Sequence, residues 1–81
     1  MLPNEKTIGL RIRRIRQVMN ETQQQLGEAV GVIQQSVAAW ESGRSLPNVQ
    51  SLIRIAEHYQ ISTDRILGLS VGCEQTPGII D

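Results

Sequence analysis

The sequence predicts an all-α protein, a compact bundle of five helices. Large apolar residues recur at spacings of three and four through most of the chain, which is the period of one buried helical face. Residues that favour helix starts precede several of these runs, and glycines follow them. The 81 residues include one tryptophan, one tyrosine and no phenylalanine, so the core must be mostly aliphatic, as in packed helices.

The first predicted helix covers residues 4–19, with Asn4 as a candidate N-cap. Its inward stripe consists of four residues at spacings of four, three and four, namely Ile8, Ile12, Ile15 and Met19. Arginines lie off this stripe. A solvated helix face is the simplest interpretation for Arg11, Arg13 and Arg14.

The pattern over residues 22–43 predicts two short helices joined by a tight turn. Thr22 is a good N-cap for the first of them, and Gly31 ends it by adopting the left-handed backbone conformation that is costly for other residues. Gly43 ends the second helix in the same way. Gly27 falls inside the first helix, where it costs roughly 1 kcal/mol relative to alanine, so we expect it to permit close packing of the second helix. The buried stripe is expected to contain Leu26, Val30, Val37 and Trp40.

The outward face of the second of these helices carries no charge. When the helix is wound at about 100° per residue, one outward arc of about 140° contains four uncharged residues, namely Gln34, Gln35, Ala38 and Ala39. Solvated helix faces are normally rich in Glu and Lys, whereas amides beside small residues suit close approach to another hydrogen-bonding surface. Glutamine can bond adenine N6 and N7 in the major groove, and alanines leave room for the helix to enter.

These features together resemble the helix-turn-helix of the lambda/434-repressor and Cro class, often called the XRE-type family. The residues that carry the resemblance are Gln23, the apolar Leu26, Val30, Val32, Val37 and Trp40, the turn glycine Gly31, and the closing Glu41 and Gly43. Gln34, Gln35 and Ser36 resemble the residues that open the recognition helix of the 434 repressor. The resemblance runs through Leu69 and implies a DNA-binding domain over residues 1–69.

The resemblance also implies roles for individual residues. On a recognition helix over about residues 33–41, bases would be read by Gln34, Gln35, Ala38 and Ala39. Phosphates would be contacted by Thr22, Gln23, Ser36, Arg44 and Asn48. Arg16 and Glu41 match the family's ion pair between the first helix and the recognition helix. Loss of one partner would leave a partly buried charge unpaired.

Ile33 departs from the family pattern, which usually has serine or threonine as the N-cap of the recognition helix. A missing cap costs about 0.5–2 kcal/mol, and a helix start displaced by one residue would rotate the outward arc. We expect Ile33 to pack in the core, because it aligns with Val37 and Trp40. The alternative is contact with a thymine methyl group in the major groove.

Two further helices are predicted after the recognition helix. Asn48 caps the fourth helix, whose apolar stripe comprises Val49, Leu52, Ile55, Ala56 and Tyr59. Ser62 caps the fifth helix, which ends near Gly68 and offers for burial Ile66, Leu67 and Leu69. Residues 70–81 change in composition and are interpreted as a C-terminal tail, either flexible or packed at a dimer interface.

The expected function is a sequence-specific transcriptional regulator of double-stranded DNA, in particular a repressor. One small domain offers few base contacts, so we expect a homodimer on a palindromic operator. The candidate dimer surface comprises Leu46, Ile61, Leu67 and Leu69. The alternative is a protein-interaction module or an antitoxin-type partner-binding protein on the same fold, which the formal net charge of zero favours.

Enzyme activity, metal binding and a cofactor are not expected. His58 is the only histidine and Cys73 the only cysteine, and neither has a partner at ligand spacing. We interpret His58 as a surface residue of the fourth helix and Cys73 as a plain tail residue. One cysteine, with no signal-peptide pattern and no apolar run of membrane length, favours a cytoplasmic location.

Overall fold

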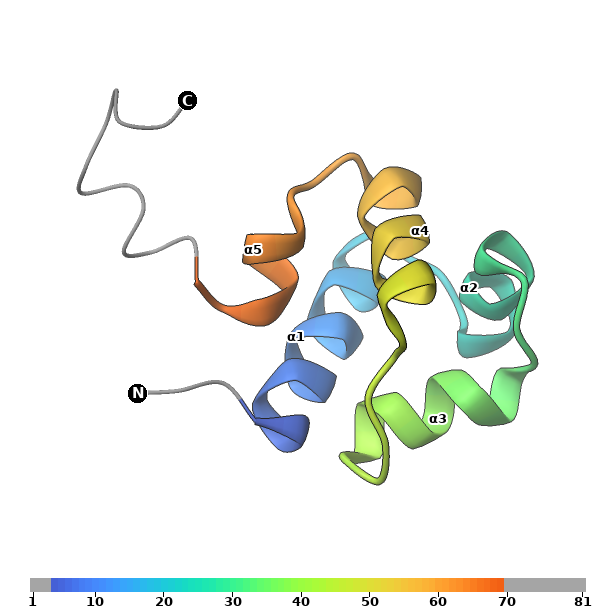
Figure 1. Cartoon of the computed structure of the whole chain (residues 1–81). Helices are drawn as coiled ribbons and strands as arrows, with labels where there is room; N and C mark the ends of the chain where they lie inside the picture. The colour runs from blue at the N-terminus through green and yellow to red at the C-terminus, as the bar shows by residue number, and fades with distance from the viewer. Residues whose placement is uncertain (1–3, 70–81) are drawn as a thin grey trace.

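The computed structural model describes residues 4–69, which form five α-helices (Figure 1). In chain order they are α1 (Glu5–Val18), α2 (Gln23–Val30), α3 (Gln34–Ser42), α4 (Val49–Tyr59) and α5 (Thr63–Leu67). The expected all-α fold is therefore confirmed. Over residues 4–69, no helix has the length and apolar character needed to cross a membrane. The predictions for residues 70–81, including Cys73, lie outside the described residues.

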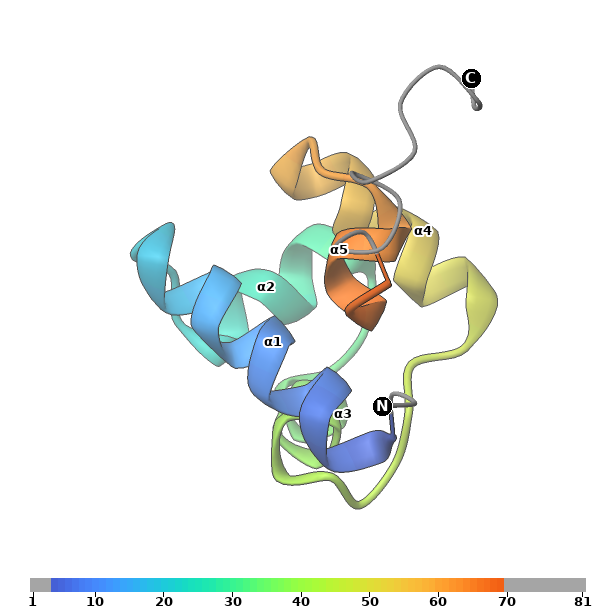
Figure 2. The same ribbon diagram turned by 90° about the vertical axis from the view of Figure 1, so that its left-hand side faces the viewer.

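The five helices close around one core. Helix α1 packs against α3 and α5, α2 packs against α3 and α4, and α4 also packs against α5. Each helix contributes a side chain that is fully buried, at 0% exposure: Ile12, Leu26, Val37, Ile55 and Ile66. Figure 2 shows α1 and α5 side by side, with α3 below them. The core is mostly aliphatic, as the composition predicts.

Four of these five helices start at an N-cap residue whose side chain accepts a backbone hydrogen bond, and the four are the residues that the sequence predicts. The Thr22 hydroxyl accepts from the backbone N–H of Gln25, whose side-chain oxygen accepts in return from the Thr22 N–H. The other three caps are Asn4, Asn48 and Ser62. Helices α2 and α3 end at Gly31 and Gly43, with φ of 81° and 84° in the left-handed region.

Three apolar residues at helix ends or beyond them are exposed, contrary to the sequence prediction. Met19 is 52% exposed, Val49 73% and Leu69 45%. Met19 is the C-cap of α1, Val49 is the first residue of α4, and Leu69 follows the end of α5. Periodicity gives the direction of a side chain but not how far along a helix its neighbours extend. The predicted stripes are therefore right at their centres and wrong at these ends.

Two glycines allow α3 to approach the helices that precede it. A Cβ at Gly27 would lie 2.7 Å from the carbonyl oxygen of Val32, which confirms the expected close packing at the turn. A Cβ at Gly9 would lie 2.0 Å from the carbonyl oxygen of Trp40, so the backbones of α1 and α3 are in contact there. The sequence pattern does not identify this second contact, because a single glycine in a helix does not show which other helix packs against it.

The contact at Gly9 predicts that Gly9→Ala lowers the free energy of unfolding by about 1–3 kcal/mol, the usual effect of overpacking. Without this contact the change would stabilise α1, since alanine is favoured over glycine by about 1 kcal/mol inside a helix. Urea denaturation followed by circular dichroism measures the difference. Arg13→Ala, at an exposed position of the same helix, is the control. A Gly9→Ala protein more stable than wild type would show that α1 and α3 do not touch here.

Candidate nucleic-acid interface

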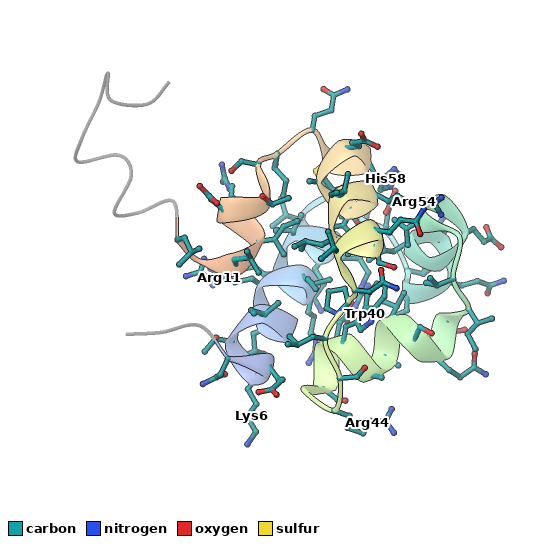
Figure 3. All side chains as sticks on the ribbon, in the orientation of Figure 1. Lys6, Arg11, Trp40, Arg44, Arg54 and His58 are labelled. Carbon is teal, nitrogen blue, oxygen red and sulfur yellow. The ribbon has the colours of Figure 1, made fainter. Side chains whose placement is uncertain are left out.

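Helix α3 presents an uncharged outer face and buries its other side. Gln34 and Gln35 are exposed in its first turn. Three smaller residues are half-buried, namely Ser36, Ala38 and Ala39. Val37 and Trp40 are buried, and Figure 3 shows Trp40 in the interior above α3. Helix geometry thus places the four predicted base-reading residues on one side of α3, opposite the buried Val37 and Trp40.

Ile33 lies at the start of this face and not in the core. It is the N-cap of α3, with extended backbone at φ −79° and ψ 159° and no side-chain cap hydrogen bond. Its side chain is 65% exposed, so the expected core packing is wrong. The N-cap residue lies outside the helical turns, and the 100° step that aligned it with Val37 does not apply to it. The helix begins at Gln34, so the predicted outward arc is retained.

A bidentate ion pair fixes the end of α3 to α1. Nε of Arg16 lies 2.7 Å from Oε2 of Glu41, and Nη2 of Arg16 lies 3.0 Å from Oε1. The two side chains are 11% and 4% exposed. The pair that the family resemblance implies is therefore present. The hydrogen bond to Glu41 raises the pKa of Arg16 above its ordinary value, against the opposing effect of burial, so the guanidinium stays charged.

Two further hydrogen bonds extend this pair into the start of α2. Nε2 of Gln23 donates to Oε1 of Glu41 at 3.1 Å. Nη1 of Arg16 donates to the backbone oxygen of Glu21 at 2.7 Å. Gln23 is a predicted phosphate contact, but its half-buried side chain is engaged with Glu41. Its first role is to join α2 to α3.

A second polar cluster joins Glu21, just before α2, to α4. The hydroxyl of Tyr59 donates to Oε1 of Glu21 at 2.8 Å, and Nε2 of His58 lies 2.9 Å from Oε2 of the same carboxylate. Burial and then the hydrogen bond to Glu21 raise the pKa of Tyr59 well above its ordinary value, so the hydroxyl keeps its proton. His58 faces α2 from α4 in Figure 3. His58 thus links α4 to the segment just before α2 and is not only a surface residue.

The remaining predicted phosphate contacts lie at or near helix ends. The side chains of Thr22 and Asn48 are the N-caps of α2 and α4, and Ser36 is half-buried in the first turn of α3. Arg44 is exposed in the loop after α3, where its Nε donates to Oγ of Ser42 at 3.1 Å.

No group of three or more His, Cys, Asp or Glu residues within residues 4–69 is arranged to hold a metal ion.

Two polar residues that lie at the C-terminal end of α3 are absent from the site that the sequence predicts, namely Ser42 of α3 and Lys6 of α1. Oγ of Ser42 accepts from Arg44 and donates to the carbonyl oxygen of Ala39 at 3.1 Å, so it holds Arg44 against the helix. The side chain of Lys6 lies on Gly43, where a Cβ would be 2.9 Å from Lys6 Cγ. Lys6 and Arg44 both extend from the side of the molecule where α3 ends (Figure 3). Helical periodicity could have identified Ser42, because it falls within the outward arc.

Comparison with known proteins agrees with this geometry. The family model for the helix-turn-helix matches residues 12–66 of the chain. The chain belongs to the helix-turn-helix family of transcriptional regulators. Its resemblance to the lambda/434-repressor class is thereby confirmed.

Two named relatives illustrate the family. The transcriptional repressor RstR of the cryptic phage CTXphi of Vibrio cholerae serotype O1 is 34% identical over 58 residues, which cover 72% of this chain and 52% of RstR. The transcriptional activator BcrR of Enterococcus faecalis is 33% identical over 57 residues, which cover 70% of this chain and 28% of BcrR. The chain thus spans about half the length of these relatives or less.

Solved structures of the P22 c2 repressor share the fold. The complex of that repressor with a synthetic operator matches with a TM-score of 0.72 and 32% identity, covering 76% of this chain and 94% of the repressor chain. The solution structure of its DNA-binding domain matches with a TM-score of 0.72 and 33% identity, covering 79% of this chain and 84% of that domain.

The buried ion pair predicts that Glu41→Leu lowers the free energy of unfolding by about 3–5 kcal/mol, because Arg16 would keep a buried charge without its partner. The double variant Arg16→Met/Glu41→Leu should recover most of this loss, since apolar replacement of a whole buried pair is often neutral. Urea denaturation of both single variants and the double variant measures the coupling. Strictly additive losses would contradict direct pairing.

Proposed function

We propose that this chain regulates transcription, as a repressor, by inserting α3 into the major groove of a specific double-stranded DNA operator. The observation that carries the proposal is the uncharged outer face of α3, on which Gln34 and Gln35 are exposed. Side-chain amides of glutamine match the donor and acceptor pattern of adenine, and the small Ala38 and Ala39 permit close approach. The likeness to the P22 c2 repressor, whose structure was solved with an operator, supports DNA as the partner.

The proposed complex contains two copies of the chain on a palindromic operator. Two recognition helices one helical turn of DNA apart double the few base contacts that one domain offers. Leu46 and Leu69, from the candidate dimer surface, are exposed, which supports their contact with a second copy. Ile61 and Leu67 are half-buried against the core and contribute less free surface. The proposal places the protein in the cytoplasm, together with the DNA.

Phosphate contacts would hold this complex in register. We assign them to Arg44 and, in addition to the sequence prediction, to Lys6, which lies at the same end of α3. Helix N-termini attract phosphates through their free N–H groups. This supports phosphate contact by the predicted residues at the starts of α2, α3 and α4, namely Thr22, Gln23, Ser36 and Asn48. Contacts of this kind position the protein without reading sequence.

Selection from a randomised duplex library at about 0.15 M salt tests the function, since exposed charges are well screened there. The expected product is an enriched palindrome with half-sites about one helical turn apart. A library without any enriched sequence would contradict the proposal. That result would favour the alternative in which the α3 face binds a protein partner.

On the selected operator, Gln34→Ala and Gln35→Ala should each weaken binding by about 1–3 kcal/mol and relax the preference at one base position. Arg44→Ala is the matched control, because loss of a phosphate contact weakens all sequences alike and lowers the log-log salt slope by about one. Fluorescence anisotropy with the operator and its single-base variants measures both effects. An unchanged base preference in both glutamine variants would remove them from base reading.

The exposure of Ile33 favours its contact with a thymine methyl group, and two substitutions test this. Ile33→Ala and Ile33→Ser both remove the apolar side chain, but only serine supplies the missing N-cap. Both variants should lose a thymine preference at one position, while the serine variant should be about 0.5–2 kcal/mol more stable than the alanine variant. Repeated library selection and urea denaturation measure the two properties. A retained thymine preference would show that Ile33 reads no base.

A further inference from the structure

A groove of about 330 Å³ lies between the C-terminal half of α1, the end of α4 and α5. None of its lining residues comes from α2 or α3, so it is separate from the candidate DNA-binding face. Its apolar lining comes from Ile15, Val18, Met19, Tyr59 and Ile61. Val18 is 75% exposed and Met19 52%, so the outer part of this apolar surface is open to water.

The rest of the groove lining is cationic. It consists of three exposed arginines, Arg11, Arg14 and Arg65. Among residues 4–69, no acidic side chain lines the groove. The ion pairs of Arg16 with Glu41 and of His58 with Glu21 do not include these arginines. The groove thus combines exposed apolar surface with three arginines.

One of the three arginines is held in position by α5. Gly68, which ends α5, has a φ of 84°, and a Cβ there would lie 2.7 Å from Nε and 3.0 Å from Cζ of Arg11. The guanidinium therefore lies against the backbone at the end of α5. Figure 3 shows Arg11 between α1 and α5. A side chain that is already oriented loses less conformational entropy when it binds a partner.

We propose that this groove binds an acidic, amphipathic segment of a partner protein. Apolar side chains of the segment cover Val18 and Met19, and its carboxylates pair with the arginines, whose guanidinium groups accept carboxylates in a bidentate geometry. From Arg11 in α1 to Met19, the C-cap of that helix, the chain rises about 12 Å, which matches roughly two turns of a partner helix laid along it. The proposal does not depend on what α3 binds.

Other occupants fit this surface less well. A second copy of the chain, packed through the same face, would bring two sets of arginines together, and like charges oppose association. A small molecule would stay largely in water, because Val18 and Met19 are exposed and ligand sites usually enclose most of their ligand. A DNA backbone offers phosphates to the arginines but leaves the apolar surface uncovered.

A random peptide library displayed on phage and selected against the full chain, without DNA, tests the proposal. The expected peptides carry Asp and Glu beside large apolar residues at helical spacing. Anisotropy with one synthetic peptide from the selection then compares protein variants. The triple variant Arg11→Gln/Arg14→Gln/Arg65→Gln and the single variant Met19→Asp should each weaken binding at least about tenfold, or about 1.4 kcal/mol. Arg13→Gln, on α1 but outside the groove, should leave affinity unchanged.

Several results would overturn the proposal. A selection without enriched peptides, or peptides that bind the triple variant as well as wild type, would exclude a peptide site in this groove. The slope of log affinity for DNA against log salt concentration could fall by about one for each arginine removed. That result would show that these arginines contact DNA phosphates. Conversion of a dimer to a monomer by Met19→Asp, seen by sedimentation, would make the groove an interface between copies. Urea denaturation of each variant confirms that it is folded.

Discussion

The ion pair between Arg16 and Glu41 is the contact on which the α3 surface depends. Helix α3 has nine residues and no side-chain cap at its start, and isolated helices of this length are not stable in water. Its position is set by contacts with the rest of the chain, namely buried Trp40, the backbone contact at Gly9 and the ion pair at Glu41. Because these contacts stabilise one side of α3, the other side needs no stabilising charges.

The same ion pair is the centre of a polar network that reaches four helices. From Glu41 in α3 it passes to Gln23 in α2 and to Arg16 in α1, and from Arg16 to the backbone of Glu21 just before α2. The carboxylate of Glu21 then reaches His58 and Tyr59 in α4. A buried ion pair contributes little net stability once desolvation is counted. Its bidentate geometry instead fixes one orientation of α3 relative to the other helices.

The sequence predicted the features that depend on near neighbours in the chain. Caps such as Thr22 and Asn48 were identifiable because a cap bonds a backbone N–H only a few residues away. Ile33 was misassigned because helical periodicity was extended to a residue outside the helix. The pairing of Glu21 with His58 could not be predicted, since these residues are 37 positions apart and polar residues have no periodic signal that joins two helices. The same applies to Gly9, whose contact with Trp40 depends on how α1 and α3 cross.

The distribution of cations links the two proposed surfaces. Of the eight basic side chains, Arg16 is used in the buried pair and three line the α1–α5 groove. Arg13 is exposed on α1, and Arg54 in α4 donates to the carbonyl oxygen of Val30 at 3.3 Å. Lys6 and Arg44 are the two that lie at the end of α3. With so few cations near α3, one domain of the proposed complex would neutralise few phosphates, and its affinity for a half-site would be modest. A second copy doubles both the phosphate and the base contacts, which is the physical reason to expect a dimer from a chain of zero net charge. An acidic segment bound in the groove would leave those contacts intact, because none of the groove's lining residues comes from α3.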